Sequence, residues 1–260
     1  MKLENKNFII TGAAQGIGLG IAQRLASEGA AVGIADLNLK AAEGAAKQIE
    51  ANGGRAVALA VDVTDREAVQ QAIAQFVERF GRLDGYFNNA GMNVPMPFLD
   101  VTESNWDLIL KVNGLGVLIG IQEAAKQMIK QGSGGKIVNT ASIASRQGYA
   151  DFAPYCSSKA AVISLTQAGA RALADHGITV NGFAPGVVAT PLWEKLDKDL
   201  MEMGASEKEG EAMEAFSQSI LLKRTARPED ISGTALFLAS ADSDYITGQI
   251  IPIDGGMILV

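Results

Sequence analysis

The sequence is poor in the residues that build metal sites and disulfides. Its 260 residues include one cysteine, Cys156, and one histidine, His176. A single cysteine excludes an intrachain disulfide, and a single histidine leaves no cluster of the usual ligands for a catalytic zinc. A Ser-His-Asp hydrolase would need His176 as its base, yet A-D-H-G is typical of a helix end, where an imidazole favours the negative end of the helix dipole. We therefore expect no metal.

The sequence also lacks a basic excess and a long hydrophobic run. It has 22 Lys and Arg against 29 Asp and Glu, a net charge of -7. Such a balance cannot neutralise phosphates, so we expect no nucleic-acid or anionic-membrane partner. The longest apolar stretches, 112–121 and 160–165, fall short of the ~20 residues that span a bilayer. Because the first residues also lack a cleavable signal pattern, we expect a cytoplasmic protein that binds a small molecule.

Hydrophobic residues, in contrast, make up 48% of the chain, enough for a large core. Short aliphatic runs predict seven strands: Phe8–Thr11, Ala31–Ala35, Ala56–Val61, Leu83–Phe87, Lys136–Thr140, Ile178–Phe183 and Gln249–Ile253. Nearly continuous apolar strands that alternate with helices indicate a parallel sheet covered on both faces. The expected fold is α/β, a Rossmann-type doubly wound seven-stranded parallel sheet in a single domain over residues 1–260.

Amphipathic patterns lie between these strands. They predict helices at Gly18–Glu28, Leu39–Ala51, Asp65–Phe80, Glu103–Lys130, Pro154–Asp175 and Pro228–Leu238. The charged, Met-containing segment 190–222 interrupts the alternation of strands and helices. It is either a solvated pair of surface helices or a small helical lid over a substrate, since it follows the carboxyl end of a strand.

A glycine-rich turn follows the first predicted strand. T-G-A-A-Q-G-I-G places Gly12, Gln15, Gly16, Ile17 and Gly18 where the strand passes into a helix. Backbone without Cβ can approach a pyrophosphate closely, and the helix N-terminus offers it free N–H groups. The alternative is a turn whose glycines only allow close packing.

Asp36 ends the second predicted strand, where a carboxylate can accept hydrogen bonds from an adenosine ribose. The same carboxylate would repel a 2′-phosphate. Neither Leu37 nor Asn38 supplies the cation that NADP would need, and Gln15 occupies a turn position where a basic residue could have reached that phosphate. We therefore expect NAD as the cofactor; the alternative is that Asp36 is only a loop residue or a helix cap.

Tyr155 and Lys159 stand four residues apart on one predicted helix, so their side chains share a face. A free phenol has a pKa near ~10, but an adjacent ammonium and a nicotinamide cation favour the phenolate. Tyr155 is thus a candidate acid/base. Ser142, at the end of the fifth predicted strand, argues against an incidental surface pair.

The order of motifs resembles the short-chain dehydrogenase/reductase family over essentially the whole chain. The matching elements are T-G-x-x-x-G-x-G, Asp36, Asp62-Val63, the N-N-A-G of Asn88 to Gly91, Asn113, Ser142, the Y-x-x-x-K of Tyr155 and Lys159, Pro185-Gly186, Thr190 and a closing I-D-G-G. Together, in order and at matching spacings, they could hardly arise by chance.

The resemblance implies a role for each of these positions. The catalytic residues would be Asn113, Ser142, Tyr155 and Lys159: Ser142 would bind the reacting oxygen, Lys159 would hold the nicotinamide ribose and Asn113 would position a water in a proton relay. An alternative for Asn113 is a polar residue at a helix kink. The implied cofactor-binding set is Gly12, Gln15, Gly16, Ile17, Gly18, Asp36, Asp62, Val63, Asn89, Ala90, Gly91, Tyr155, Lys159, Pro185, Gly186, Val188 and Thr190.

The expected substrate pocket is largely apolar. Its wall comprises Ser142, Ile143, Ala144, Gly148, Tyr149, Tyr155, Val187 and Trp193. A small uncharged alcohol or ketone fits such a wall best, although Arg146 and Lys195 leave a charged substrate open. The stretches around these residues resemble acetoin reductase/2,3-butanediol dehydrogenases, followed by sugar-alcohol dehydrogenases. Trp193 either contacts the substrate or anchors the lid.

Two rival functions share this fold. A 3-oxoacyl-thioester reductase would use the same catalytic residues, but would favour NADP and a basic surface for a carrier protein. A non-catalytic NAD-binding regulator would not need the complete set of four catalytic residues. The resemblance also implies a homotetramer, with the helices near 103–130 and 154–175 at one interface and the C-terminal strand at another.

Overall fold

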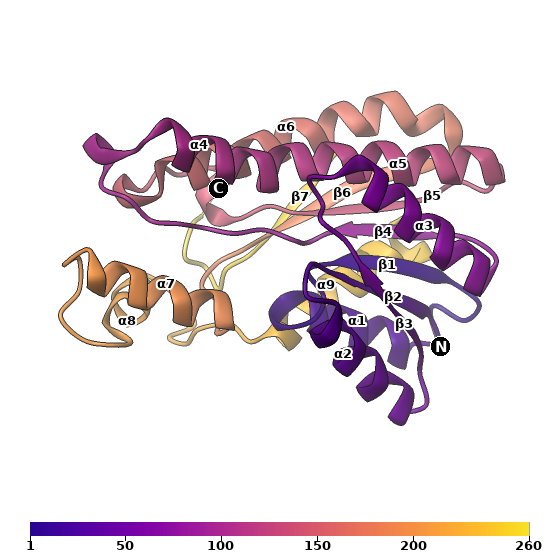
Figure 1. Cartoon of the computed structure of the whole chain (residues 1–260), viewed down its shortest axis with the longest axis horizontal. Helices are drawn as coiled ribbons and strands as arrows, with labels where there is room; N and C mark the ends of the chain where they lie inside the picture. Colours follow the sequence, from indigo (N-terminus) through magenta and orange to yellow (C-terminus); the bar gives the residue numbers. More distant parts are fainter. Residues whose placement is uncertain (260) are drawn as a thin grey trace.

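A computed structural model describes residues 1–259 as a three-layer α/β sandwich (Figure 1). Its seven strands form one parallel sheet in the order β3-β2-β1-β4-β5-β6-β7. The strands are β1 (Asn7–Thr11), β2 (Ala31–Asp36), β3 (Arg55–Ala60), β4 (Gly85–Asn88), β5 (Gly135–Thr140), β6 (Ile178–Pro185) and β7 (Ile250–Ile253). The expected doubly wound fold is confirmed, and each strand begins and ends within two residues of its predicted range.

Helices cover both faces of the sheet. The α-helices are α1 (Gly16–Ser27), α2 (Leu39–Ala51), α3 (Arg66–Phe80), α4 (Glu103–Leu110), α5 (Gly116–Gln131), α6 (Ala153–Leu173), α7 (Pro191–Glu202), α8 (Glu211–Ser217) and α9 (Pro228–Ala239). Short 3₁₀ turns occur at Phe98–Asp100, Ile143–Ser145, Ala150–Phe152, Ala174–His176 and Ala241–Ser243. Helices α1, α2 and α9 bury their apolar residues on one face, and α3, α5 and α6 on the other.

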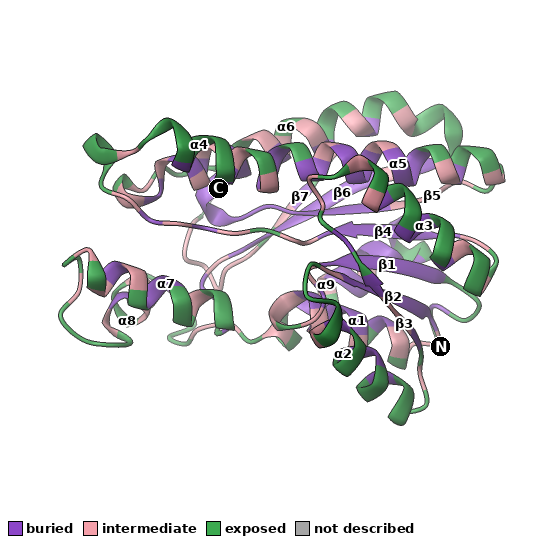
Figure 2. Ribbon diagram, viewed as in Figure 1, coloured by how far each residue is buried: buried purple, intermediate pink, exposed green. Residues whose placement is uncertain are grey.

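Side-chain alternation in the strands explains the two cores. In β1, Phe8 and Ile10 join the core under α1, α2 and α9, whereas Ile9 joins the opposite core. Successive side chains of a strand point to opposite faces, so a strand that is buried on both sides must be apolar throughout. Figure 2 shows the result, with buried strands at the centre and exposed residues on the outer surfaces of the helices.

Local sequence sets many of the helix ends. Asp65 caps α3 by accepting hydrogen bonds from the backbone N–H groups of Glu67 and Ala68, and Gly81 ends the same helix with φ of 87°. Asn38 caps α2 by accepting from Ala41 N. These side chains satisfy helix N–H groups that have no partner within the helix, and glycine adopts the left-handed conformation at little cost.

One predicted helix differs from the structure. The expected continuous helix Glu103–Lys130 is divided by a π-helical turn, η2 (Lys111–Leu115), between α4 and α5. A β-carbon on Gly116 would lie 2.8 Å from Val63 Cγ2, so glycine lets this helix approach the loop after β3. π turns inside helices are frequent at functional sites, and this one carries Asn113.

The strand order reverses between β1 and β4. Strands β2 and β3 extend the sheet on one side of β1, and β4 to β7 extend it on the other. Ligands of open α/β sheets bind beyond the carboxyl ends of the strands at such a switch point. Helices α7 and α8, orange in Figure 1, lie beyond this edge, and a β-bridge between Val188 and Ala226 joins the two ends of their segment.

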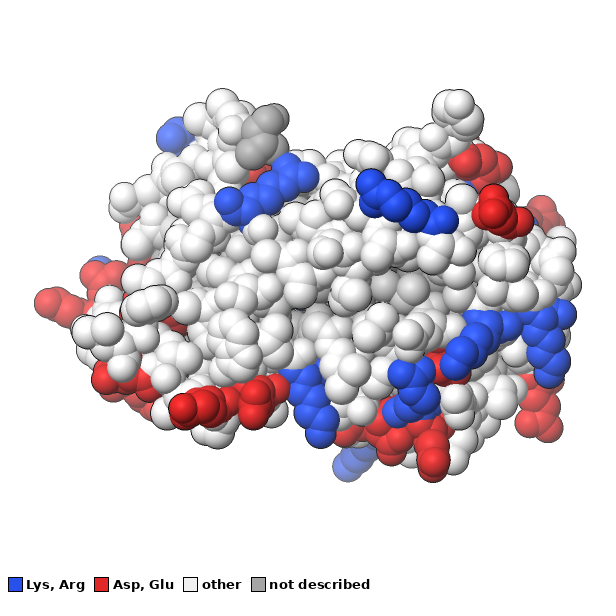
Figure 3. All heavy atoms as spheres, turned by 90° about the horizontal axis from the view of Figure 1, so that it is seen from above, with Lys and Arg blue, Asp and Glu red and all other residues white. Residues whose placement is uncertain are grey.

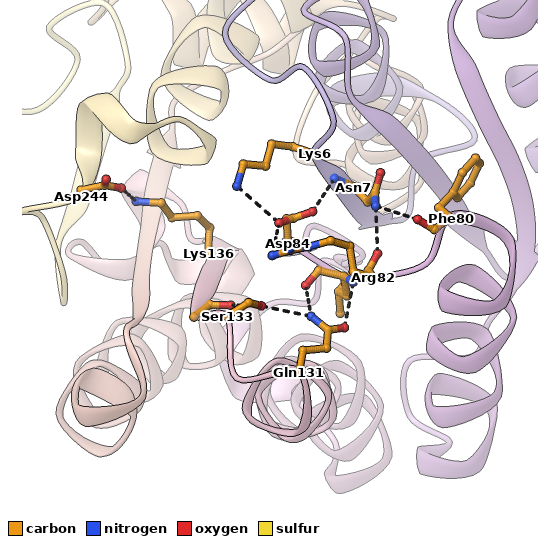
Figure 4. Close-up of polar contacts among 11 residues, drawn as sticks. Lys6, Asn7, Phe80, Arg82, Asp84, Gln131, Ser133, Lys136 and Asp244 are labelled. Atoms are coloured by element: carbon orange, nitrogen blue, oxygen red, sulfur yellow. Dashed lines mark hydrogen bonds and ion pairs between the residues drawn. The ribbon is translucent and has the colours of Figure 1, made fainter.

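The opposite edge of the sheet is held by a buried carboxylate, Asp84 (Figure 4). Its side chain accepts a hydrogen bond from Asn7 N at 3.0 Å and forms ion pairs with Arg82 at 2.8 Å and Lys6 at 3.5 Å. Asn7 also donates to the Phe80 carbonyl. These contacts join the amino-terminal ends of β1 and β4.

The run Glu103–Gln131 is long and apolar enough to cross a membrane by composition alone. Most of it is buried within the protein, and α5 contributes Val117, Ile119, Ala124 and Met128 to the core beside α3 and α6. Its hydrophobicity therefore has a structural explanation as a core helix.

Candidate active site

A cavity of about 410 Å³ opens at the switch point. Every residue of the expected cofactor set lines it: Gly12, Gln15, Gly16, Ile17, Gly18, Asp36, Asp62, Val63, Asn89, Ala90, Gly91, Tyr155, Lys159, Pro185, Gly186, Val188 and Thr190. Most of these residues lie at the carboxyl ends of the strands or directly after them, and Tyr155 and Lys159 lie on helix α6. The volume lies in the ~300–1,000 Å³ range typical of sites for sizeable small molecules.

The glycine turn shapes one wall of this cavity. Gly12 and Gly16 have φ of 61° and 58°, in the left-handed region that favours glycine. A β-carbon on Gly18 would lie 2.4 Å from the Gly12 carbonyl oxygen, so a side chain there would force the turn apart. No side chain caps the N-terminus of α1, which begins at Gly16 and faces the cavity. Its N–H groups and dipole suit an anionic group such as a pyrophosphate.

Thr11 and Asn89 fix the turn relative to β4. The Thr11 hydroxyl donates to the Phe87 carbonyl and accepts from Asn89 N and Ala90 N, the last two at 3.0 Å. The Asn89 amide donates to the carbonyls of Thr11 and Gly12. Asn89 therefore lines the cavity and also connects two strand ends, whereas Thr11 was not among the residues predicted from the sequence.

Asp36 is held at the rim of the cavity by backbone N–H groups. One carboxylate oxygen accepts from Ala14 N at 3.1 Å and the other from Asn38 N at 3.0 Å. The carboxylate thus stabilises the glycine turn as well as facing the cavity. Within residues 1–259, Lys159 is the only basic residue in the cavity lining, so the rim offers no cation to a 2′-phosphate.

Tyr155, Lys159 and Ser142 meet at the inner end of the cavity. Pro154 lies in the first turn of helix α6, which carries both Tyr155 and Lys159, and Lys159 Nζ lies 5.8 Å from the centre of the Tyr155 ring. Lys159 is buried and donates to the Thr140 carbonyl at 2.8 Å. Ser142 follows β5, and its hydroxyl accepts from Ala144 N. The end of β5 and one face of α6 therefore bring the three side chains together.

Burial controls the protonation of this group. It raises the pKa of the Tyr155 phenol above its ordinary value, and the nearby Ser142 hydroxyl lowers that pKa by less. Burial also lowers the pKa of Lys159 to about 8. The sequence predicts that the ammonium and a nicotinamide cation together favour the phenolate; in the protein alone burial opposes this, because removing the phenolate from water outweighs the hydrogen bond with Ser142.

Asn113 is the expected catalytic residue that lines neither cavity. Its amide is fully engaged: it accepts from Met92 N and donates to the Met92 carbonyl and to Ser158 Oγ. A β-carbon on Gly91 would lie 3.2 Å from Asn113 Oδ1 and 3.4 Å from Lys159 Nζ, which places both residues beside Gly91. The Asn113 side chain thus fixes the loop after β4 close to Lys159.

A second cavity, of about 70 Å³, adjoins the first at Ser142, Tyr155 and Trp193. All but one of the residues of the expected wall line it: Ser142, Ile143, Ala144, Tyr149, Tyr155, Val187 and Trp193. Gly148 does not, because its position opens to space with nothing within 4 Å. Arg146 donates to the Ile250 carbonyl and Lys195 pairs with Asp199, so neither cation lines the cavity.

An aromatic cluster joins the α7–α8 segment to the body of the protein. Phe216 of α8 lies 5.5 Å from Tyr149, 5.8 Å from Phe152 and 5.6 Å from Trp193, measured between ring centres. Trp193 therefore packs in this aromatic cluster and also lines the small cavity. Five residues that line this cavity were not predicted from the sequence: Asn93, Phe152, Leu192, Leu196 and Phe216.

The described part of the chain contains no group of three or more His, Cys, Asp and Glu residues placed to hold a metal ion. The groups that line the two cavities include instead a phenol, a hydroxyl, an ammonium and a helix N-terminus. The first three suit the binding and proton transfer of an alcohol or ketone, and the last suits a phosphate.

Comparison with known proteins agrees with this chemistry. Residues 12–258 match the family model described as Enoyl-(Acyl carrier protein) reductase. The chain is 42% identical to a diacetyl reductase [(S)-acetoin forming] of Staphylococcus epidermidis, over 98% of this chain and 99% of that one. It is 42% identical to an L-2,3-butanediol dehydrogenase of Corynebacterium glutamicum, with 98% and 99% covered, and 43% identical to a galactitol 2-dehydrogenase of Agrobacterium fabrum, with 98% of each covered.

Solved structures show the same likeness. A short-chain type dehydrogenase/reductase from Mycobacterium marinum is 36% identical, with a TM-score of 0.90 and coverage of 100% of this chain and 98% of that one. Levodione reductase is 33% identical, with a TM-score of 0.92 and 98% of each chain covered. Family match, full-length relatives and fold agree: the chain belongs to the short-chain dehydrogenase/reductase family and is an oxidoreductase.

Proposed function

We propose that this protein is an NAD-dependent dehydrogenase that interconverts a small secondary alcohol, vicinal diol or polyol and its ketone. The observation that carries the proposal is the position of Tyr155 and Ser142, whose side chains line both the large cavity and the small one. A substrate in the small cavity and a nucleotide in the large one would meet at these two hydroxyl groups.

The residues of the large cavity fit a dinucleotide. The Gly12–Gly18 turn and the start of α1 would hold the pyrophosphate, and Asp36 would accept hydrogen bonds from the adenosine ribose. Asp62 and Val63 would contact the adenine, and Val188 and Thr190 the carboxamide. The fixed carboxylate of Asp36 supports NAD over NADP, as does a cavity lining that, within residues 1–259, contains no basic residue other than Lys159.

The side chains of this protein would move the proton. During oxidation Tyr155 accepts the proton of the substrate hydroxyl, while Ser142 donates a hydrogen bond to the same oxygen. Lys159 holds the ribose and lowers the cost of the phenolate, and Asn113 positions the loop beside it. When bound, the nicotinamide supplies the hydride acceptor, which is the cofactor's own chemistry.

The small cavity supports a small uncharged substrate. Its volume of about 70 Å³ is far below that of sites for drug-sized ligands, and most of its lining is apolar. Relatives of the chain are named for diacetyl, 2,3-butanediol, sorbitol and galactitol. A thioester carried on a protein would also need a basic docking surface, which a chain with a net charge of -7 is poorly suited to provide.

Replacing Tyr155 by Phe tests the proposal. The wild type would first be screened for NADH formation from 2,3-butanediol stereoisomers, sorbitol, xylitol and galactitol, with NADP in parallel. Tyr155→Phe should lower kcat by a factor of about 10² to 10⁴ for the substrate that reacts, because the general acid/base is lost. NAD binding, measured by calorimetry, should persist in the variant. Unchanged turnover would contradict the assignment of Tyr155, and activity only with NADPH and a 3-oxoacyl thioester would contradict the proposed function.

The proposal includes a cytoplasmic homotetramer. Exposed apolar side chains on α4, η2 and α5 support it, among them Trp106, Leu108, Leu115 and Ile129. Figure 3, which views the molecule from the side of α4 to α6, shows few charges across the middle of this face. Such surfaces suit burial between subunits, and the mass of the protein in solution would measure the assembly.

A further inference from the structure

A chain of buried hydrogen bonds joins β4, β5 and α6. The Asn88 amide donates to Asn139 Oδ1 at 2.8 Å, and the Asn139 amide donates to Thr166 Oγ1 at 2.9 Å. The Thr166 hydroxyl in turn donates to the Val162 carbonyl at 2.7 Å. Asn88 is 4% exposed and the other two side chains are fully buried, so these polar groups find their partners inside the protein.

The position of Asn139 in β5 is otherwise apolar. Ile137 and Ala141, two residues before and after it, point to the same face of the sheet and belong to the core beside α3, α5 and α6. An aliphatic residue would match these neighbours, whereas a buried amide is costly unless it is hydrogen-bonded. A paired polar chain in a core specifies one arrangement of the elements that carry it. The amide therefore indicates that the position of α6 relative to β5 matters.

The same two elements carry the reacting groups. Lys159 lies two turns before Thr166 on the buried face of α6, and its ammonium donates to the carbonyl of Thr140, the residue after Asn139. Lys159 and Thr166 are about 10 Å apart along the helix axis. The lysine side chain is long and flexible and can follow a displaced helix, whereas the short Asn139 and Thr166 side chains cannot. Their hydrogen bond therefore determines where α6 lies along β5.

We propose that Asn139 is a positioning residue, whose hydrogen bond with Thr166 holds α6 where Tyr155 meets Ser142, the residue just after β5. The inference rests on the proposed function. Tyr155 and Ser142 line both cavities and have to reach the same substrate oxygen. A misplacement of about 1 Å can lower a rate about 10²-fold. Asn139 and Thr166 line neither cavity, so their effect on the rate would pass through Tyr155.

Thr166→Val tests this role, because it removes the hydroxyl and nearly keeps the shape of the side chain. For the alcohol that reacts, kcat should fall about tenfold, while KM and NAD binding change little. The rise of oxidation with pH should also move to higher pH, because the Ser142 hydroxyl lowers the pKa of Tyr155 and a displaced phenol loses this contact. Thr166→Ser keeps the hydroxyl and should keep the kcat and the pH profile of the wild type.

A double-mutant cycle links the effect to this hydrogen bond. Asn139→Leu should lower kcat and shift the pH profile as Thr166→Val does. The double variant should lower kcat no further than Asn139→Leu alone, because both substitutions remove one contact. Additive losses would overturn the role of the bond. So would a wild-type kcat and pH profile in Thr166→Val, or an equal loss in Thr166→Ser.

Asn181 provides a matched control. It is a buried amide of β6, 1% exposed, which donates to the Ile246 carbonyl and accepts from Gln249 N. Asn181→Leu should lower the melting temperature, as Asn139→Leu does, but leave the pH profile of oxidation unchanged. An equal shift of the profile in Asn181→Leu would overturn the positioning role and leave the dehydrogenase assignment intact. A wild type inactive toward every alcohol with either cofactor would overturn the proposed function and this inference with it.

Discussion

Lys159 is buried and Tyr155 is partly buried, in surroundings that disfavour the charged form of each side chain. Burial raises the pKa of the phenol and lowers that of the ammonium. At neutral pH Tyr155 is therefore protonated in the protein without cofactor, which is the form needed to reduce a ketone. Oxidation of an alcohol needs the phenolate, so the two directions of the reaction depend on opposite protonation states of one side chain.

This dependence predicts a pH profile for each direction. The kcat/KM for alcohol oxidation should rise with pH, by up to about tenfold per unit, as Tyr155 loses its proton. The kcat/KM for ketone reduction should stay level at neutral pH and fall only at high pH. Initial rates between pH 6 and 10 would measure both. Parallel profiles in the two directions would show that Tyr155 is not the titrating group.

The buried ammonium of Lys159 should lower the free energy of unfolding of the protein. Its pKa of about 8 in the folded protein lies below the ~10.4 of an unfolded lysine, so the unfolded state binds the proton more tightly. The penalty is complete below pH 8 and disappears as the pH rises toward ~10.4. Lys159→Met should therefore raise the free energy of unfolding at pH 7 by roughly 2–3 kcal/mol, after allowing for the lost hydrogen bond to Thr140.

Thermal unfolding of Lys159→Met and the wild type at pH 7 and pH 10 would test this expectation. The variant should also lose turnover, and its gain in stability over the wild type should be smaller at pH 10 than at pH 7. Lys130, an exposed residue of α5, serves as the control, and Lys130→Met should change the melting temperature little at either pH. A Lys159→Met variant less stable than the wild type at pH 7 would mean that the ammonium is better satisfied than its burial implies.

At the scale of elements, the α7–α8 segment is attached to the body by its aromatic cluster and by the bridge at its ends. Phe216 contacts three aromatic rings, each at a distance that stabilises such pairs by about 0.5–1.5 kcal/mol. This attachment places Trp193 against the small cavity. The segment therefore meets the geometric requirements of a substrate lid.

Phe216→Ala should loosen this segment without unfolding the sheet. We expect kcat/KM for the substrate to fall about tenfold, mainly through a higher KM, because α8 no longer fixes Trp193 at the cavity. Limited proteolysis of the segment should become faster, while NAD binding changes little. Tyr245→Ala, at a fully exposed aromatic residue, provides the control and should leave KM unchanged. An unaltered KM in Phe216→Ala would argue against the lid.

The sequence predicts strands and helix boundaries well where the residues of the element itself determine them. Strands β1 and β2 are apolar except at their ends because both of their faces are buried, and Gly81 and Asn38 mark helix boundaries through their own backbone or side-chain chemistry. No local spacing predicts the π turn at 111–115 or the contact of the glycine that follows it, Gly116, with the distant Val63. Asn93 and Phe216 were missed for the same reason, since no spacing relates them to Tyr155.

At the scale of the whole molecule, the carboxyl ends and the amino-terminal ends of the strands have different roles. The carboxyl ends of the strands surround the cavities, and the amino-terminal ends of β1 and β4 are held by the contacts of Asp84. A substitution near the amino-terminal ends of β1 and β4 can therefore change the stability of the protein without altering the active site.

Asp84→Ala tests this separation. The variant should lose about 1–3 kcal/mol of unfolding free energy, because Asn7 N is left buried without its acceptor. Its kcat and KM at 25 °C should match those of the wild type. Asp244→Ala, which removes the exposed partner of Lys136 in Figure 4, should cost less, about 0–1 kcal/mol. A large loss of turnover in folded Asp84→Ala would show that the two edges are coupled.

The adjacency of β1 and β4 also determines when the protein becomes able to bind NAD during folding. Thr11 and Phe87, joined by a hydrogen bond at the switch point, are separated by 76 residues along the chain. A long loop must close before the glycine turn meets the Asn89 loop, and such non-local pairing is slow. Recovery of NAD binding should therefore lag behind the return of helical signal during refolding, because the site comes into being only when distant parts of the chain have met.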